Sequence, residues 1–182
     1  EKGDIDMARK LTPGDIQAVS ANPDIKIQEE QRGRIFYIAA NQKVETLANT
    51  KVIEAIKYLI DYEGMANSFL KGQVVPHQAF LPKGFLGAID DRPYTLNVEK
   101  AKALLKEAGY ENGFEVTLWV RNEQKRLDMA QSIQNTLGQG GIKVNIRSGT
   151  GAEILGDYRA RKHELILEVW GPDYPDPQTN AD

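Results

Sequence analysis

Residues 115–146 read EVTLWVRNEQKRLDMAQSIQNTLGQGGIKVNI, and this stretch decides the fold class. Residues 115–121 form a mostly apolar run that predicts a β-strand. The next segment repeats apolar residues at the spacing of one helix face, and Gly138 is expected to end that helix. Residues 142–147 alternate apolar and polar side chains, which predicts a strand with one face in solvent. The apolar helix positions are Leu127, Ala130, Ile133 and Leu137.

The same alternation of strand and helix continues toward the C-terminus. A short helix is predicted from 152 to 161, and a mostly apolar strand from 164 to 170. Strands that alternate with helices along the chain are the pattern of an α/β protein. We therefore expect an α/β fold in which a mixed sheet is flanked by helices.

The N-terminal part of the chain predicts one helix and two strands. Thr12 followed by Pro13 is typical of a helix start, because the hydroxyl can cap the helix and proline lacks only an N–H that has no helical partner. Two extended runs, 25–29 and 34–40, flank a polar break that contains Gly33, and we interpret them as a hairpin. Both faces of the second run are apolar, so this strand is expected to be covered on both sides.

The middle of the chain predicts two helices joined by a long loop. Residues 72–93 are rich in proline and glycine and are interpreted as an ordered loop that wraps over the surface. Asn97 is expected to cap the second helix, and Gly109 to end it. The first helix has its apolar face at Val52, Ala55, Ile56, Leu59 and Ile60.

The composition limits the class of protein. The chain has 182 residues, of which 41% are hydrophobic, so it can bury a core and is not generally disordered. We expect a single domain over residues 1–182. The chain contains no cysteine, which excludes disulfides and thiolate metal sites. Its net charge of −3 argues against general binding to the phosphate backbone, so no nucleic-acid partner is expected.

Several other classes lack their sequence pattern. No apolar run reaches about 18 residues, so the chain is not expected to span a membrane. The first residues lack the basic and apolar regions of a signal peptide, which is either absent or already removed. His77 and His163 are the only histidines and have no ligand cluster near them in sequence, so no metal site is expected. The chain has no nucleophile elbow and no phosphate loop, and we predict neither a cofactor nor an enzyme.

The residues that follow the last predicted strand form the strongest candidate site. Prolines at 172, 175 and 177 end the strand near Trp170 and stiffen the segment that carries Asp173. Ligands of open α/β sheets bind beyond the carboxyl ends of the strands. Asp173 is therefore a candidate ligand-binding residue, with turn capping as its alternative role. Trp170 can form a pocket wall or fill the core. A hydrolytic pair of Asp173 with Asp176 is a third, poorer interpretation.

Four more residues are candidates on weaker grounds. Trp119 and Arg121 share one face of the strand 115–121, and Asn122 stands at its carboxyl end. They are predicted either to face a cleft or to form a solvated strand end. Arg159 is either a ligand-binding residue or part of a solvated helix end.

Six segments of the chain resemble, in their order and rough spacing, the extracellular solute-binding proteins of peptide and nickel ABC importers. Each segment alone is a weak signal, and the resemblance covers essentially the whole chain. The segments are Gly3-Asp4-Ile5-Asp6, residues 35–41, 55–61, 101–110 and 141–144, and Trp170-Gly171-Pro172-Asp173-Tyr174-Pro175-Asp176-Pro177.

The resemblance implies a lobe of a periplasmic-binding-protein-like fold. Proteins of this family are two-lobed and close by hinge motion over a ligand held between the lobes. The chain is then expected to be the C-terminal lobe alone, with a missing N-terminal lobe and an ABC permease as partners in the full-length protein. The expected ligand is a short peptide or a peptide-like small molecule, and the expected location is periplasmic or extracellular.

The resemblance also implies roles for single residues. The acid that matches Asp173 pairs with the α-ammonium group of the ligand in peptide-binding members, and Gly171 matches a position that the ligand backbone approaches closely. In peptide-binding members, a basic group near the position of Arg159 can pair with the ligand carboxylate. Two residues depart from the family pattern, namely Ile53 in place of an arginine and Gly140 in place of an ordinary alanine. The competing hypothesis is a stand-alone scaffold or interaction domain that retains no ligand binding.

Overall fold

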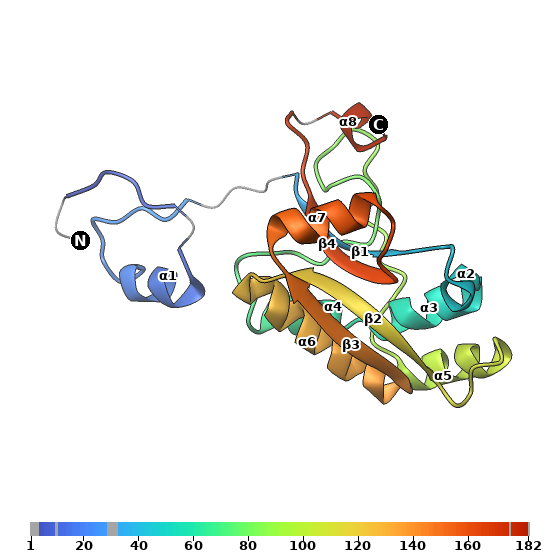
Figure 1. Ribbon diagram of the computed structural model, residues 1–182. Coiled ribbons are helices and arrows are strands. Elements are labelled where there is room, and N and C mark those ends of the chain that lie inside the picture. Colours follow the sequence, from blue (N-terminus) through green and yellow to red (C-terminus); the bar gives the residue numbers. More distant parts are fainter. Residues whose placement is uncertain (1–3, 10, 29–32, 175, 182) are drawn as a thin grey trace.

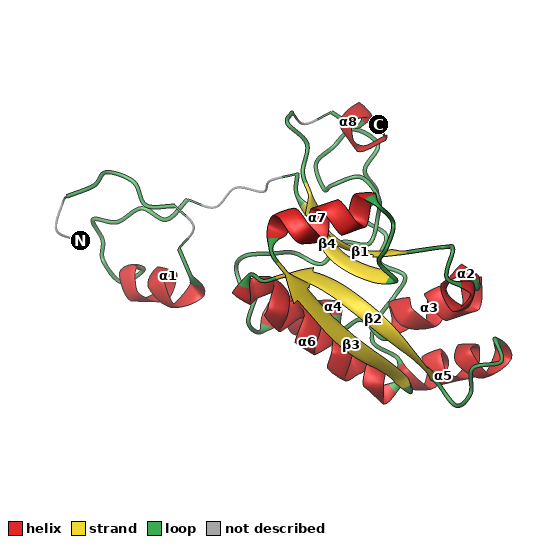
Figure 2. Ribbon diagram, viewed as in Figure 1, coloured by secondary structure: helices red, strands yellow, loops and turns green. Residues whose placement is uncertain are grey.

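The computed structural model describes residues 4–9, 11–28, 33–174 and 176–181, and Figures 1 and 2 show its elements. The sheet is formed by β1 (Ile35–Ala40), β2 (Phe114–Arg121), β3 (Ile142–Gly149) and β4 (Leu165–Trp170). The helices are α1 (Pro13–Val19), α2 (Glu45–Ala48), α3 (Thr50–Tyr58), α4 (Tyr62–Asn67), α5 (Val98–Glu107), α6 (Gln124–Gln139), α7 (Gly151–Arg159) and α8 (Gln178–Ala181).

The four strands form a mixed sheet in the order β1-β4-β2-β3. The strands β2, β3 and β4 are parallel, and β1 is antiparallel to β4. The register places Arg121 beside Gly149 and Trp170 beside Ile35. These four residues therefore lie along one border of the sheet, which we call the carboxyl edge. The predicted α/β fold with a mixed sheet flanked by helices is confirmed.

The two faces of the sheet carry hydrophobic clusters of different size. The larger cluster joins one face of all four strands to α3, α5 and α6. The smaller one lies under α7 and contains Trp119, Ile154 and Ile166. Figure 1 shows α7 on one side of the sheet and α6 on the other, while α1 stands apart from both. The larger cluster holds most of the buried apolar surface, so most of the hydrophobic stabilisation comes from that face.

The predicted hairpin of 25–29 with 34–40 is wrong. Residues 25–28 contain no strand, and residues 29–32 lie outside the described part of the chain. Instead β1 pairs with β4 over its whole length, from Ile35 beside Trp170 to Ala40 beside Leu165. The reason is that β1 is apolar on both faces, and at the edge of the sheet beside β4 one face packs against the larger cluster and the other against the smaller one.

The helix predictions are confirmed with small shifts at their ends. The Thr12 side chain accepts a hydrogen bond from the Asp15 N–H and caps α1, and the Asn97 side chain caps α5. Gly109 has a φ of 86°, as expected for a residue that ends a helix. The sequence predicts that α6 ends at Gly138, but the helix extends to Gln139. The chain leaves it at Gly140, the C-cap residue, and Gly141, which has a positive φ. The described residues between α4 and α5 form a loop without helix or strand, as predicted.

The structure gives a reason for Gly140, which departs from the family pattern. A Cβ atom at Gly140 would collide with the Leu59 side chain and would lie 2.9 Å from its Cδ2. Leu59 is fully buried at the end of α3 and has little room to move. The other departure, Ile53, is half-buried and packs against the larger cluster, where an arginine would have to leave the apolar surface.

The Gly140→Ala variant is expected to lose about 1–3 kcal/mol of unfolding free energy, because overpacking a filled core forces side chains and backbone to shift. Gly138→Ala is the matched control. Gly138 lies inside α6, and a Cβ there would meet nothing within 4 Å. Alanine at 138 should stabilise the chain by roughly 0.5–1 kcal/mol. Urea unfolding of the two variants measures both effects, and equal midpoints would contradict the assignment of Leu59 as the obstacle.

Candidate functional site

The carboxyl edge is where the sequence placed the candidate site, and Asp173 lies there in an exposed position. Asp173 follows the end of β4 by a few residues, and its carboxylate has no hydrogen bond or ion pair with any described residue. The capping role belongs to Asp176, whose Oδ1 accepts a hydrogen bond of 2.8 Å from the Gln178 N–H at the start of α8. Asp173 is thus available to a ligand, whereas Asp176 is engaged by the backbone.

Trp170 and Gly171 connect β4 to this acid. Trp170 is half-buried, which is compatible with either of its two predicted roles. A Cβ atom at Gly171 would lie 2.6 Å from Cγ of Arg34, so the Arg34 side chain occupies the space that the missing side chain leaves. The close approach to Gly171 is made here by the protein itself. Whether a ligand backbone also approaches this glycine stays a prediction.

Trp119 lies deeper than the edge. It is 6% exposed and belongs to the cluster under α7 with Ile154 and Ile166. The Arg147 guanidinium stacks on its ring at 4.0 Å from the centroid. The Arg147 guanidinium therefore covers the outer side of the indole. Trp119 packs in the cluster between the sheet and α7.

Arg121 and Asn122 end β2 at the carboxyl edge. The Arg121 Nε donates a hydrogen bond of 2.6 Å to Oε1 of Glu168 in β4. The Asn122 N–H donates to the Gly149 carbonyl at 2.8 Å, which joins the ends of β2 and β3, and its side chain is exposed. Arg121 is partly buried and Asn122 is in solvent, so only Arg121 has a fixed partner at this edge.

Arg159 is not brought together with the other candidates. It is exposed in the last turn of α7, and the first residue of that helix, Gly151, adjoins the carboxyl edge. Just beyond the helix, the Asn41 side chain donates hydrogen bonds to the carbonyls of Arg161 and His163. Asn41 directly follows β1, whose C-terminal end lies at the opposite border of the sheet. Arg159 therefore lies at that opposite border.

Glu168 is a charged residue of this edge that the sequence analysis missed. Its side chain is 3% exposed and lies between two arginines. Oε1 accepts from Arg121 Nε, and Oε2 accepts from Arg126 Nη1 at 3.0 Å. Oε2 also accepts from the Val169 N–H at 3.1 Å. The available signal was a single glutamate inside the apolar run of residues 165–170, which is rarely buried without a partner.

The electrostatics around Glu168 favour its charged form. Burial by itself raises the pKa of this carboxyl, because it disfavours the ionised state. The hydrogen bonds from Arg121, the Val169 N–H and Arg126 outweigh burial and hold the pKa of Glu168 below its usual value. Tyr37 lies beside Glu168 on β1. Burial first, then its hydrogen bond with Tyr158, raises the pKa of Tyr37. Glu168 is thus an ion and Tyr37 a neutral phenol at neutral pH.

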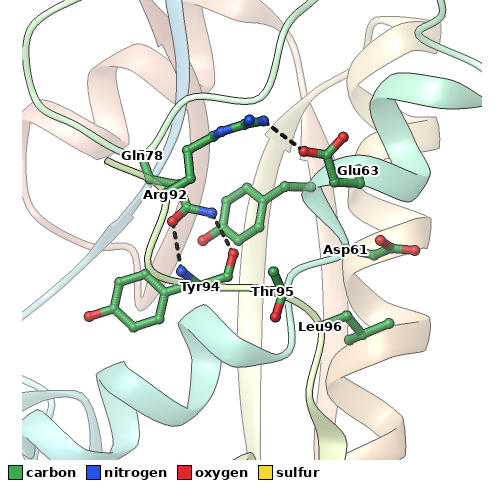
Figure 3. A pocket seen from close by; sticks show the side chains of 8 residues that line it. Asp61, Glu63, Gln78, Arg92, Tyr94, Thr95 and Leu96 are labelled. Atoms are coloured by element: carbon green, nitrogen blue, oxygen red, sulfur yellow. Dashed lines mark hydrogen bonds and ion pairs between the residues drawn. The ribbon is translucent and has the colours of Figure 1, made fainter. Parts of the chain in front are cut away.

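A cavity of about 280 Å³ lies away from these residues, between α4 and the loop that precedes α5 (Figure 3). Its polar groups are largely engaged with one another. Arg92 Nη1 lies 2.8 Å from Glu63 Oε1, and the Gln78 amide makes two hydrogen bonds with the Tyr94 backbone. Burial raises the pKa of Tyr62, another lining residue, to about 12. None of the predicted site residues lines this cavity.

The described residues offer neither a cluster of metal ligands nor a membrane-spanning helix. They contain no group of three or more histidine, cysteine, aspartate or glutamate side chains that could hold a metal ion. No helix in the described ranges is long and apolar enough to cross a membrane. The site that remains is an exposed acid, a half-buried indole and a guanidinium at the carboxyl edge of an α/β sheet.

The fold matches that of one part of the periplasmic binding proteins. A periplasmic binding protein of Helicobacter pylori superposes with a TM-score of 0.84 over 93% of this chain and 33% of its own, at 24% identity. The chain belongs to the bacterial extracellular solute-binding proteins, family 5, whose middle-region model matches residues 1–182.

Two further proteins are similar in sequence as well. The dipeptide-binding protein of Escherichia coli is 29% identical over 171 residues, which is 91% of this chain and 32% of that protein. A dipeptide-binding protein from a Pseudoalteromonas species, solved in complex with Met-Leu, is 25% identical with a TM-score of 0.82, over 93% of this chain and 34% of its own. The chain therefore spans about a third of the length of these relatives.

Proposed function

We propose that this chain is a ligand-binding lobe of a solute-binding protein that serves an ABC importer, and that its ligand is a short peptide or a peptide-like molecule. Asp173 anchors a cationic nitrogen of the ligand and Trp170 packs against the ligand. The observation that carries the proposal is the exposed Asp173 carboxylate, without a partner among the described residues, at the carboxyl edge. The dipeptide-binding relatives support the ligand class.

The proposal extends to partners and location. A second lobe closes over the edge and excludes water, and the closed protein docks on a permease outside the cytoplasmic membrane, in the periplasm or at the cell surface. The chain acts by binding and carries out no chemistry on its ligand. Residues 1–182 form the C-terminal lobe as one domain. Since half of the ligand contacts belong to the other lobe, the isolated chain should bind weakly.

The Asp173→Asn variant is expected to weaken binding of the dipeptide Met-Leu, because asparagine keeps the shape of the side chain and removes the charge. In the isolated chain the exposed pair contributes about 0–1 kcal/mol, so the dissociation constant should rise by up to about fivefold. In the complete, closed protein a charged hydrogen bond of about 1.5–3 kcal/mol predicts a loss of roughly 10–150-fold. Backbone amide chemical shifts of Trp170, Gly171, Asp173 and Tyr174, followed by NMR at millimolar peptide, report on the binding.

Two controls make this test specific. N-acetyl-Met-Leu lacks the ammonium group and should bind wild type no better than Met-Leu binds Asp173→Asn. The Asp176→Asn variant should bind Met-Leu as wild type does, because the Asp176 carboxylate is engaged by the Gln178 N–H. A chain that folds cooperatively and shows no shift near Asp173 at any peptide concentration would support the stand-alone scaffold instead.

A further inference from the structure

Arg121 has hydrogen-bond donors to spare at the carboxyl edge. A guanidinium carries five N–H donors in a planar fork. Arg121 uses the one on Nε for Glu168, and its Nη1 and Nη2 groups have no hydrogen bond or ion pair with any described residue. The side chain is 25% exposed, so these donors reach the solvent. The outer half of this guanidinium is free to meet an acceptor.

Arg126, the other partner of Glu168, is placed differently. Its side chain is 5% exposed and lies between two carboxylates. Nη1 is hydrogen-bonded to Glu168, and Glu123 Oε2 lies 3.0 Å from Nε without the alignment of a hydrogen bond. Arg126 thus neutralises Glu168 from inside the protein. Of the two guanidiniums, Arg121 is the one turned toward solvent.

Glu168 fixes the direction in which the Arg121 fork points. Glu168 lies on β4 beside the end of β2. Val120 of β2 pairs with Leu167 of β4, and the residues that follow them in the two parallel strands are Arg121 and Glu168. Its own carboxylate is held from two sides, by Arg126 and by the Val169 N–H. A buried carboxylate with this many partners has one orientation, so the bond at Nε fixes the plane of the Arg121 guanidinium, and neither Nη1 nor Nη2 is hydrogen-bonded to Glu168. Without the hydrogen bond to Glu168, the Arg121 side chain would sample many rotamers.

The surroundings of the Arg121 fork favour an anion. A Cβ atom at Gly151 would lie 3.5 Å from Arg121 Nη1, so the fork lies against the first residue of α7. The N-terminal end of a helix carries partial positive charge. The nearby Glu153 carboxylate is directed to Gly149 and lies 3.7 Å from Arg147, which gives it a separate cation. The position next to Nη1 and Nη2 therefore combines two sources of positive potential.

We infer that Arg121 binds a carboxylate group of the ligand through Nη1 and Nη2, and that Glu168 is the positioning residue that presents this fork at the carboxyl edge. The inference rests on the proposed function for the identity of the ligand. It assigns to Arg121 the carboxylate-binding role that the sequence analysis considered for Arg159. With Asp173 on the neighbouring strand end, the edge offers a cation and an anion to a zwitterionic molecule.

The test uses sodium acetate as the probe and the side-chain NMR signals of arginine as the readout. In wild type, acetate should shift the Arg121 Nε–Hε signal in a saturable way, while sodium chloride at the same ionic strength should not. Glu168→Gln should weaken the acetate response of Arg121 by about fivefold to tenfold. It should also merge the separate Nη1 and Nη2 signals, because the guanidinium can then rotate. Arg121→Gln removes this Nε–Hε signal and so confirms its assignment, and Arg159→Gln, the matched control on α7, should leave the Arg121 response unchanged.

The outcomes separate this inference from the proposed function. An acetate response of Arg121 that is unaltered in folded Glu168→Gln, or shared equally by the exposed arginines, would overturn the inference. If Glu168→Gln does not fold, the double variant Glu168→Met with Arg126→Met removes the buried charges together and still leaves Arg121 unpositioned, so its acetate response should fall equally. Methylammonium chloride probes Asp173 separately. If methylammonium caused no shift near Asp173 in wild type while acetate still shifted the Arg121 signal, the result would contradict the proposed function and leave this inference intact.

Discussion

Glu168→Ala is expected to lower the free energy of unfolding by about 3–5 kcal/mol, which is the usual cost of removing one partner from a buried ion cluster. In the variant, Arg126 loses the Glu168 carboxylate and faces a cavity instead, while its side chain stays buried at 5% exposure. The net stability of a domain is only about 5–15 kcal/mol, so the loss is a large fraction of the total. Urea unfolding should show the midpoint lowered by roughly 1–3 M.

Glu115→Ala is the matched control for this prediction. Glu115 lies on the neighbouring strand β2 and is also paired with a cation, Lys143 at 3.1 Å, but its side chain is 54% exposed. An exposed pair of this kind contributes about 0–1 kcal/mol, so the control should unfold close to wild type. Equal losses in the two variants would contradict the assignment of burial as the cause.

The Glu168 contribution should also depend on pH in a defined direction. The folded-state pKa of Glu168 lies below its value of 4.5 in an unfolded chain. A carboxyl of this kind stabilises the fold above the unfolded pKa, and its contribution is lost as the pH falls through the folded pKa. The difference in unfolding free energy between wild type and Glu168→Ala should therefore be full at neutral pH. It should shrink as the pH falls below 4.5 and through the lower folded-state pKa of Glu168. A gap that widened on acidification would contradict the ion cluster.

Gly113→Ala is the second substitution with a large expected effect, about 2–5 kcal/mol of destabilisation. Gly113 precedes β2 with a φ of 75°, a left-handed conformation that costs an alanine roughly 1–2 kcal/mol. A Cβ atom there would also collide with the carbonyl of Gly141 and lie 2.8 Å from its carbonyl carbon. Because the obstacle is backbone, the starts of β2 and β3 would have to separate, which adds a cost of about 1–3 kcal/mol.

Gly109→Ala isolates the two parts of this effect. Gly109 has a φ of 86°, and a Cβ atom there would meet nothing within 4 Å. This control should lose only the conformational part, roughly 1–2 kcal/mol. Thermal or urea unfolding of both variants gives the difference. If Gly113→Ala cost no more than Gly109→Ala, the close approach of Gly141 would have no energetic weight.

The sequence predicted the elements of the second half of the chain closely, and the reason is that their signals are local. The helix α6 and the strand β3 each carry their period within one segment, and Asn97 and Gly109 mark the ends of α5 through their own backbone chemistry. The same kind of signal placed Asp173 beyond the last strand. Prolines near it forbid a further ladder, and no partner elsewhere in the chain is needed to reach that conclusion.

The predictions that failed or stayed open depend on distant residues. The run 34–40 reads as one arm of a hairpin, and only the sheet shows that its partner is β4, more than a hundred residues away in the chain. Trp119 and Arg121 share one face of the strand 115–121 and look equivalent in sequence. Trp119 is covered by Arg147 and by Ile154 of α7, whereas Arg121 lies at the carboxyl edge against the first residue of that helix, where its side chain is 25% exposed.

The amino-acid sequence by itself determined the α/β class, most of the elements and the position of Asp173 beyond the last strand, since each follows from periodicity, capping or proline chemistry within a short window. Only the tertiary structure decided that β1 joins the sheet, that Gly140 must stay small beside Leu59, and that Glu168 holds Arg121 and Arg126 together. The physical reason is that packing and ion pairing depend on which surfaces meet, and these surfaces come from segments far apart in the chain.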